Sequence, residues 1–157
     1  MTLSIAWEAF DSLSPSNLHS VLNLRQRVFV VEQKCAYLDA DEFDRLSFHG
    51  IGRDETGDVV AVARILPPHT KQQEASIGRI AVAEHVRRFG YGRALVAAAV
   101  REVRRRYPNS VVHIDAQRYL EQFYSSLGFV RFGEPFYEDG IPHIPMKLSD
   151  QSRPGIV

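Results

Sequence analysis

The residues whose types and spacing most clearly indicate a binding site lie in a short basic, glycine-rich segment, residues 86–95. An apolar run at 77–82 precedes it, and a helical pattern of apolar residues follows. This order places unpaired backbone N–H groups at the start of a helix, where a phosphate binds readily. Arg87, Arg88 and Arg93 crowd the positive end of the helix dipole, where cations are normally disfavoured. The segment predicts a pyrophosphate site; the plainer alternative is a glycine turn with solvated arginines.

Two familiar phosphate-binding motifs do not fit this segment. A Rossmann fingerprint requires G-x-G-x-x-G/A close behind the first strand, but Gly90-x-Gly92 lies in mid-chain. A P-loop requires Gly-Lys-Ser/Thr, whereas an arginine and an alanine follow Gly92. The pattern that remains is Arg-x-x-Gly-x-Gly, formed by Arg87, Gly90 and Gly92.

The composition indicates one ordinary globular domain. The 157 residues suit a single core, which we expect over 1–148, with a polar tail at 149–157. Nineteen basic residues balance nineteen acidic ones, which argues against a nucleic-acid or membrane-surface binder. The single cysteine, Cys35, excludes an internal disulfide and is read as an ordinary thiol. We see neither a signal peptide nor an apolar run near the roughly 20 residues of a membrane span, and expect a cytoplasmic protein.

Hydrophobic periodicity and turn residues predict alternating strands and helices. Three expected strands follow one another between 46 and 82 while helices separate the others, so the sheet must be mixed. We expect an α/β (α+β) fold with a mixed, mostly antiparallel central sheet flanked by helices. The expected strands are 3–10, 46–53, 58–66, 75–82, 110–117, 129–132 and 141–148, and the expected helices are 15–30, 93–107 and 118–127.

A second motif makes the first more specific. Residues 124–129 read Tyr-x-x-x-Gly-Phe, closing one expected helix and opening a strand. The Arg-x-x-Gly-x-Gly segment resembles the pyrophosphate loop of the GNAT superfamily of acetyl-CoA-dependent N-acetyltransferases, which commonly carry the tyrosine motif beside the cofactor thiol. The two motifs occur in the right order and at roughly the right separation. Residues 24–33 and 140–143 further resemble the ElaA-like branch.

The resemblance implies a GNAT fold, in which the strand before the phosphate loop and the strand after the next helix splay around acetyl-CoA. It implies direct acetyl transfer to a primary amine, on a small molecule or a peptide, in a ternary complex without metal. A longer acyl donor and a homodimer stay open. Tyr124 is the implied catalytic residue. The implied cofactor-binding residues are Ile80, Ala81, Val82, Arg87, Arg88, Phe89, Gly90, Tyr91, Gly92, Arg93 and Gln117.

The two readings of Tyr124 differ. By spacing alone it shares a helix face with Leu120, Phe123 and Leu127, as a core tyrosine would. The resemblance implies instead that its phenol protonates the departing CoA thiolate. A phenol with a pKa near 10 stays protonated at pH 7 and can protonate such a thiolate through a small uphill step. The resemblance also implies a strand N–H near Val82 as the donor that polarises the thioester carbonyl.

Two positions depart from the family pattern. Gln117 stands where GNAT enzymes often have asparagine, and Ser76 stands where some members carry a catalytic glutamate. Because serine is no base at neutral pH, a non-catalytic acyl-CoA-binding sensor remains the alternative function. The proton acceptor for the amine stays open among His113, Asp115, Glu42, Asp44 and His49.

Two charged features require partners or water. Arg79 lies within an apolar strand, expected on the face of Ile77 and Ala81, and a charge there needs a partner or a wet cavity. We expect it to pair with Asp115, or else to line the acceptor site. The acidic residues between 39 and 44 are predicted to form a solvated loop, the alternative being attraction of a cationic acceptor. No His/Cys/Asp cluster has metal-ligand spacing.

Overall fold

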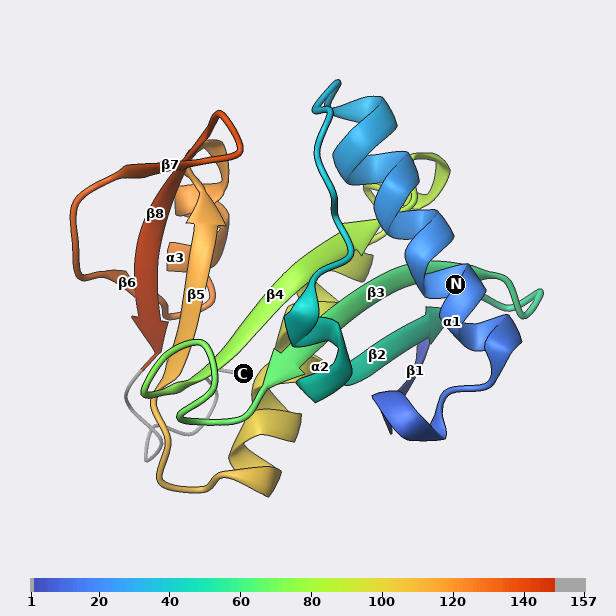
Figure 1. The fold of residues 1–157 in the computed structure, drawn as a ribbon, viewed down its shortest axis with the longest axis horizontal. Coiled ribbons are helices and arrows are strands. Elements are labelled where there is room, and N and C mark those ends of the chain that lie inside the picture. Colours follow the sequence, from blue (N-terminus) through green and yellow to red (C-terminus); the bar gives the residue numbers. More distant parts are fainter. Residues whose placement is uncertain (1, 149–157) are drawn as a thin grey trace.

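The computed structural model describes residues 2–148, which form one eight-stranded sheet with helices on both faces (Figure 1). The strand order is β1-β2-β3-β4-β5-β8-β6, and β7 also pairs with β8. The strands are β1 (Ser4–Ala9), β2 (Phe48–Arg53), β3 (Val59–Leu66), β4 (Ala75–Val82), β5 (Val112–Gln117), β6 (Val130–Arg131), β7 (Phe136–Glu138) and β8 (Ile141–Leu148). The α-helices are α1 (Pro15–Arg25), α2 (Tyr91–Arg106) and α3 (Glu121–Ser125), and the short helical turns are η1 (Phe10–Ser12), η2 (Gln26–Glu32), η3 (Glu42–Leu46), η4 (Glu84–Val86) and η5 (Arg118–Leu120).

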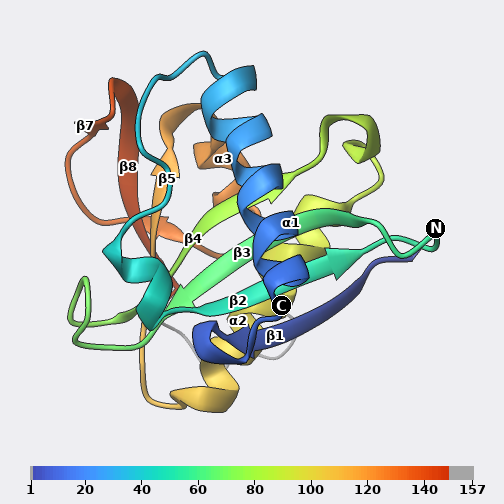
Figure 2. The same cartoon turned by 45° about the vertical axis from the view of Figure 1, so that its right-hand side comes forward.

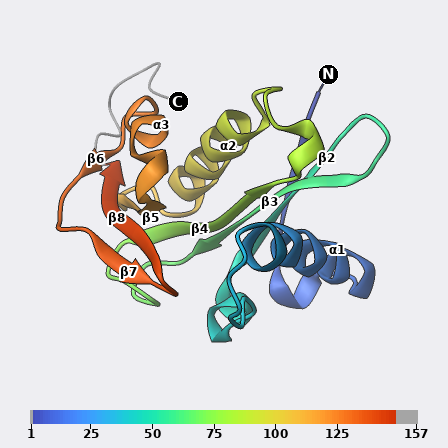
Figure 3. The ribbon, with the colours of Figure 1, turned by 90° about the horizontal axis from the view of Figure 1, so that it is seen from above.

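The helices form two layers, with α1 on one face of the sheet and α2 and α3 on the other (Figure 3). The main core cluster lies on the α2 side, where Val96 and Ala99 pack with Ile114 of β5 and Ile144 of β8. A second cluster on the α1 side joins helix residues such as Val21 to β3 and β4. Because side chains alternate along a strand, neighbouring positions of β5 and β8 face opposite layers.

Most expected elements occur close to their expected bounds. The Asn17 N–H donates to Ser14 Oγ over 3.0 Å, so Ser14 caps α1 as a serine before a first-turn proline should. The helical segment continues to Glu32 through the π-helical turn η2. The closing hairpin differs from expectation, because β8 pairs with the unforeseen β7 as well as with β6. The expected tail at 149–157 lies outside the described residues. Among the helices of residues 2–148, none has the length and apolar character that a membrane span requires.

The sheet splits between β4 and β5 (Figures 1 and 2). These parallel strands pair only at Ala75–Ile77 with Val112–Ile114, whereas β5 pairs with β8 along its whole length. A bulge in β4 accompanies the split, since Arg79 and Ile80 together lie opposite the single residue Ala63 of β3. A bulge bends its strand and increases the local twist, which carries β4 away from β5.

The bulge also reverses the side-chain alternation of β4. Ile77 and Ile80 pack against the α2-side cluster, whereas Ala81 belongs to the α1-side cluster. Arg79 has φ 48°, in the left-handed region, and its side chain reaches Asp39 on the α1 side. The expectation that Ile77, Arg79 and Ala81 share one face is therefore wrong, because the extra residue breaks the period of two.

Arg79 belongs to a closed cycle of ion pairs, which we call the Arg–Asp ring. Asp39 binds Arg25 Nε at 2.7 Å and Arg79 Nε at 2.8 Å. Asp41 contacts Arg79 and Arg64, the latter at 2.6 Å. Asp44 closes the cycle with contacts of 2.7 and 2.8 Å to Arg25 and Arg64. The ring joins α1, β3 and the β4 bulge to residues 39–44. In the order of their contacts its members are Arg25, Asp39, Arg79, Asp41, Arg64 and Asp44.

The ring corrects two expectations. The acidic segment is not a solvated loop, because the Asp39 and Asp44 side chains are buried and fully engaged by arginines. Arg79 pairs with Asp39 and Asp41, and Asp115 pairs with His113 instead. The pairings of Arg79 are not visible in the sequence, because their partners lie about forty positions away, whereas His113 and Asp115 are two residues apart on β5.

Removing one member of the ring should destabilise the fold strongly. Asp44→Ala leaves two buried guanidinium groups without a full set of partners, so we expect the free energy of unfolding to fall by about 3–5 kcal/mol. The matched control is the exposed Glu42→Ala in the same segment, with an expected change within about 0.5 kcal/mol. Urea unfolding measures both, and equal small losses would contradict a structural ring.

The ring should also make stability depend on acid. Burial alone would raise the pKa of Asp44, but hydrogen bonds and charge from Arg25, with help from the Asp41 N–H and Arg64, lower it to about 2. A lowered folded-state pKa stabilises the protein above the unfolded-state value near 3.8, and this stabilisation is lost as the pH falls towards about 2. Urea unfolding between pH 5 and pH 2 should show this loss, with a shallower dependence in Asp44→Asn.

Candidate active site

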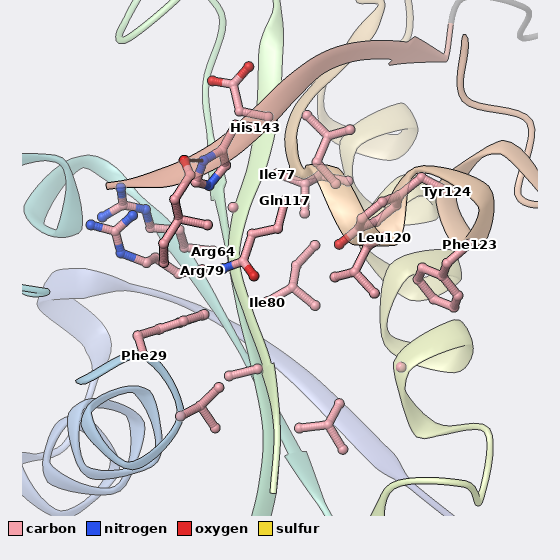
Figure 4. Close-up of a pocket in the computed structure, with 18 of the residues that line it drawn as sticks. Phe29, Arg64, Ile77, Arg79, Ile80, Gln117, Leu120, Phe123, Tyr124 and His143 are labelled. Carbon is pink, nitrogen blue, oxygen red and sulfur yellow. Dashed lines mark hydrogen bonds between the residues drawn. The ribbon is translucent and has the colours of Figure 1, made fainter. Parts of the chain in front are cut away.

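A cavity of about 690 Å³ occupies the split between β4 and β5 (Figure 4). Its wall comes from β4, β5, the start of α2, α3, the end of η2 and the β7–β8 turn. The cavity therefore opens towards both layers of the molecule. Ten of the eleven residues expected to bind a cofactor line it, together with Tyr124; the exception is Phe89, whose side chain is 52% exposed.

One end of the cavity is the N-terminus of α2. Gly90 is the N-cap with φ 80°, and no side chain of the described residues caps the first turn. The first recorded helical hydrogen bond runs from the Ala94 N–H to the Gly90 carbonyl over 3.0 Å. A Cβ placed on Gly90 would have nothing within 4 Å, so the space in front of these amides is open. An anion can reach this positive end of the helix.

The three arginines beside this turn differ in their contacts. Arg87 donates through Nε and Nη2 to the Val82 carbonyl at 3.1 and 3.0 Å, and it pairs with Glu32. Arg93 donates to Ser126 Oγ at 2.7 Å, linking α2 to the end of α3. Arg88 is exposed and lines the cavity at φ 81°. Arg87 therefore holds the turn against β4, while Arg88 is available to a bound anion.

The β4 wall offers backbone groups more than side-chain chemistry. Ile80, Ala81 and Val82 line the cavity after the point where pairing with β5 ends. Among the described residues, no strand lies opposite this edge of β4 beyond Ile77. An extended ligand can therefore align with it as an added strand would.

Tyr124 enters the cavity from the α2 side. Its side chain is 5% exposed, its ring contacts Phe123 and Phe129 edge-on, and its hydroxyl points into the cavity (Figure 4). Burial raises the pKa of the Tyr124 phenol above its ordinary value, and the neighbouring Tyr119 adds to the shift. Tyr124 is thus both a core residue, as its spacing indicates, and a cavity residue that stays protonated at neutral pH.

Two links cross the mouth of the cavity. Gln33, after η2, and Gln117, at the end of β5, exchange amide hydrogen bonds of 3.3 Å. The Cys35 thiol donates to the Asp139 carbonyl at 3.3 Å, in the β7–β8 turn. Gln117 is therefore already engaged by a neighbouring amide, on the α1 side of the cavity.

Of the five expected proton acceptors, only two line the cavity. His113 Nε2 lies 2.8 Å from Asp115 Oδ1, and both side chains face the cavity. Burial alone would raise the pKa of Asp115, but the hydrogen bond and charge of His113, with Lys71 and His143, lower it. Asp44 belongs to the Arg–Asp ring, and His49 is buried with Nε2 2.8 Å from the Asp44 carbonyl.

Glu42, Ser76 and His143 differ in their positions relative to the cavity. Glu42 is exposed and away from the cavity, whereas Ser76 is buried and lines it. His143, which the sequence reading did not single out as a base, also lines the cavity from β8. Its only sequence signal is its place in the 140–143 segment. Within residues 2–148, no three His, Cys, Asp or Glu side chains are grouped so that they could hold a metal ion.

Comparisons with known proteins agree with this geometry. Residues 42–149 match the family model described as an acetyltransferase (GNAT) domain. A UPF0039 protein of Synechocystis (sll0451) is 42% identical, over 93% of this chain and 95% of its own. The crystal structure of an acyl-CoA N-acyltransferase from Pseudomonas aeruginosa superposes with a TM-score of 0.88 at 32% identity, covering 94% of this chain and all of that one. Escherichia coli ElaA superposes with a TM-score of 0.86 at 35% identity, covering 93% and 99%.

The two glycines of the α2 turn should respond differently to a methyl group. Gly90→Ala forces alanine into the left-handed region, so we expect a loss of about 1–2 kcal/mol in unfolding free energy. Gly92→Ala meets only ordinary contacts, at 3.9 Å from Phe123 and 4.0 Å from Val82, so we expect no loss. Thermal or urea unfolding compares the two, and equal losses would contradict the left-handed conformation at Gly90.

Proposed function

Because the chain belongs to the GNAT acetyltransferase family, whose fold uses acetyl-CoA as co-substrate, we propose that it transfers an acetyl group from acetyl-CoA to a primary amine. The proposed transfer is a direct attack in a ternary complex, with a small-molecule or peptide amine as acceptor. Family membership confirms the resemblance seen in the two sequence motifs and in the ElaA-like segments.

The observation that carries the proposal is a cavity that passes through the sheet. The uncapped α2 turn lies at one end, Tyr124 faces it from the α2 side, and polar residues face it from the α1 side. A long cofactor with an anionic end and a reactive thioester end fits such a passage. The amine acceptor then approaches from the opposite face of the sheet.

The geometry of the α2 turn supports pyrophosphate binding independently of family membership. Its first-turn amides have no side-chain cap among the described residues, and the space before Gly90 is open. In the proposal these amides, from Arg88 to Arg93, hold the phosphate oxygens, and Arg88 adds charge. Arg87 acts by positioning, because its guanidinium is occupied by the Val82 carbonyl and Glu32.

The β4 edge and Tyr124 are proposed to serve the thioester end. The open edge at Ile80–Val82 binds the pantetheine arm through backbone groups, and an N–H near Val82 polarises the thioester carbonyl. Tyr124 protonates the departing thiolate. The raised pKa keeps its phenol protonated before the reaction, so the proton is present when the thiolate forms.

A non-catalytic acyl-CoA sensor is the second candidate, because Ser76, at the place where the family resemblance implies a catalytic glutamate in some members, offers the cavity only a buried hydroxyl. A sensor binds the cofactor without turnover, whereas an enzyme releases CoA thiol when amines are added.

Cofactor binding is the first test. Gly90→Asp puts a side chain and a negative charge before the α2 amides, so we expect acetyl-CoA affinity to fall at least tenfold in calorimetric titration. The matched control is Gly57→Asp, also at positive φ with open space around it, in the exposed β2–β3 turn. Gly57→Asp should bind like the wild type. Unchanged binding by Gly90→Asp would contradict the proposed pyrophosphate site.

The acid role of Tyr124 is the second test. Tyr124→Phe keeps the ring packing and removes the hydroxyl, so kcat should fall by about 10²–10⁴-fold while acetyl-CoA affinity stays within twofold. Tyr107→Phe, in a half-buried tyrosine at the end of α2, controls for loss of a hydroxyl elsewhere. An unchanged kcat in Tyr124→Phe would remove the residue from the chemistry.

A further inference from the structure

We propose that His143 is the base that accepts the proton of the acceptor amine, an assignment that rests on the proposed acetyl transfer. A primary amine has a pKa near that of lysine, about 10.4, and arrives mainly as an ammonium ion, so it must lose a proton before attack. Of the residues that the sequence suggested, only His113 and Asp115 line the cavity, and both are engaged: His113 Nε2 lies 2.8 Å from Asp115 Oδ1, and Gln72 Nε2 donates to Asp115 Oδ2 at 3.3 Å.

The local backbone fixes the tautomer of His143. Its Nδ1 lies 2.7 Å from the Ile141 carbonyl, an acceptor only, so Nδ1 must carry the proton. The lone pair is then on Nε2, the atom that a general base needs. The side chain is 11% exposed and faces the cavity beside Gln117 (Figure 4).

Charged groups of both signs lie near His143. Glu138 Oε2 lies 3.8 Å from Nε2, across the β7–β8 hairpin, and stabilises an imidazolium by charge. Asp115 of β5 interacts with His143 through charge, and Lys71, 3.8 Å from the other Glu138 oxygen, opposes these carboxylates. The Phe136 ring stacks on the imidazole at 5.8 Å and fixes its plane.

His113 lacks these properties although it lines the same cavity. Its Nε2 is held by Asp115, and its Nδ1 is buried without a hydrogen-bond partner among the described residues. A buried Nδ1 cannot reach an amine. His113 and Asp115 therefore form a closed pair, whereas His143 keeps one nitrogen for the substrate.

The sheet places His143 and Tyr124 on opposite sides of the reacting centre. His143 lies opposite Gln117 in the β5–β8 pairing, and paired residues share a face, which here is the α1 side. The alternate residues Ala116 and Ile144 pack in the α2-side core together with Tyr124. The base therefore meets the amine where the acceptor enters, and the acid meets the thiolate where the cofactor lies.

The proton balance follows from this division. As the carbon–nitrogen bond forms and the carbon–sulfur bond breaks, the ammonium nitrogen loses two protons in all. His143 Nε2 accepts them in turn and passes each to water. Tyr124 gives one proton to sulfur and regains one from water, so one proton is released per amide formed.

The first test observes the tautomer of the His143 imidazole and needs no turnover. Nitrogen-15 spectra of the imidazoles should show the Nδ1–H tautomer for His143 once it is neutral. A dominant Nε2–H tautomer would overturn the assignment whether or not the protein turns over.

The second test uses pH–rate profiles with acetyl-CoA and three probes: glycinamide, n-butylamine and a tripeptide with a free N-terminus. Ionisation of the amine alone gives log(kcat/KM) a slope of one against pH. Below the pH at which His143 titrates in the spectra, the wild type should steepen to a slope of two. For His143→Gln the slope of log(kcat/KM) against pH should stay at one, and kcat/KM at neutral pH should fall about 10²–10⁴-fold. The exposed His19→Gln should match the wild type.

Two comparisons separate a chemical role from a structural one. Imidazole added to His143→Ala should restore part of the lost rate, which a merely structural residue would not allow. His113→Gln should retain the steep limb. A steep limb that persists in His143→Gln and vanishes in His113→Gln would overturn the assignment while leaving acetyl transfer intact. No turnover by the wild type with any probe, despite cofactor binding, would contradict both the assignment of His143 and the proposed acetyl transfer.

Discussion

The cleft exists because the Arg–Asp ring holds β4 in a conformation that its sequence alone would not favour. Arg79 sits in the left-handed region, at a cost of about 1–2 kcal/mol for a residue with a Cβ, and the bulge depends on it. The ring anchors this guanidinium to Asp39 and Asp41, and through them to α1 and β3. Each charge in the ring has two opposite neighbours, so the four buried members and the partly exposed Arg79 and Asp41 carry no net charge. A bulge fixed in this way keeps β4 and β5 apart without a ligand between them.

The split sheet separates two kinds of chemistry that one pocket wall could not easily hold. On the α2 side the surroundings of Tyr124 are aromatic and dry, which keeps its phenol protonated. On the α1 side Glu138, Asp115 and the histidines make a polar wall that tolerates a charged amine. The gap between β4 and β5 connects the two sides, so the proposed acid and the proposed base both face one cavity.

Much of this architecture could be predicted from the sequence, and the failures have definite causes. The apolar stripe of α2, the Ser14 cap and the run at 75–82 are local signals, and local signals placed these elements well. The bulge at Arg79 breaks the period of two, so a face assignment that assumes this period must fail there. The Arg–Asp ring joins residues up to forty positions apart, and no spacing shows which aspartate meets which arginine. The role proposed for His143 depends on the contact of its Nδ1 with the Ile141 carbonyl, which no spacing in the sequence shows.

The two halves of the sheet, β1–β4 and β5–β8, are joined at one end and separated at the other. At the closed end, three residue pairs of β4 and β5 form a continuous sheet, backed by the core beneath α2. At the open end, the Gln33–Gln117 amide pair and the Cys35 thiol join the two halves through uncharged bonds of 3.3 Å, and Lys71 adds an ion pair with Glu138 at 3.8 Å. Such hydrogen bonds contribute about 0.5–1.5 kcal/mol each, so the tips separate at a lower cost in free energy than the paired closed end. The proposed acceptor entrance is therefore bounded by the contacts between the two halves that cost least to break.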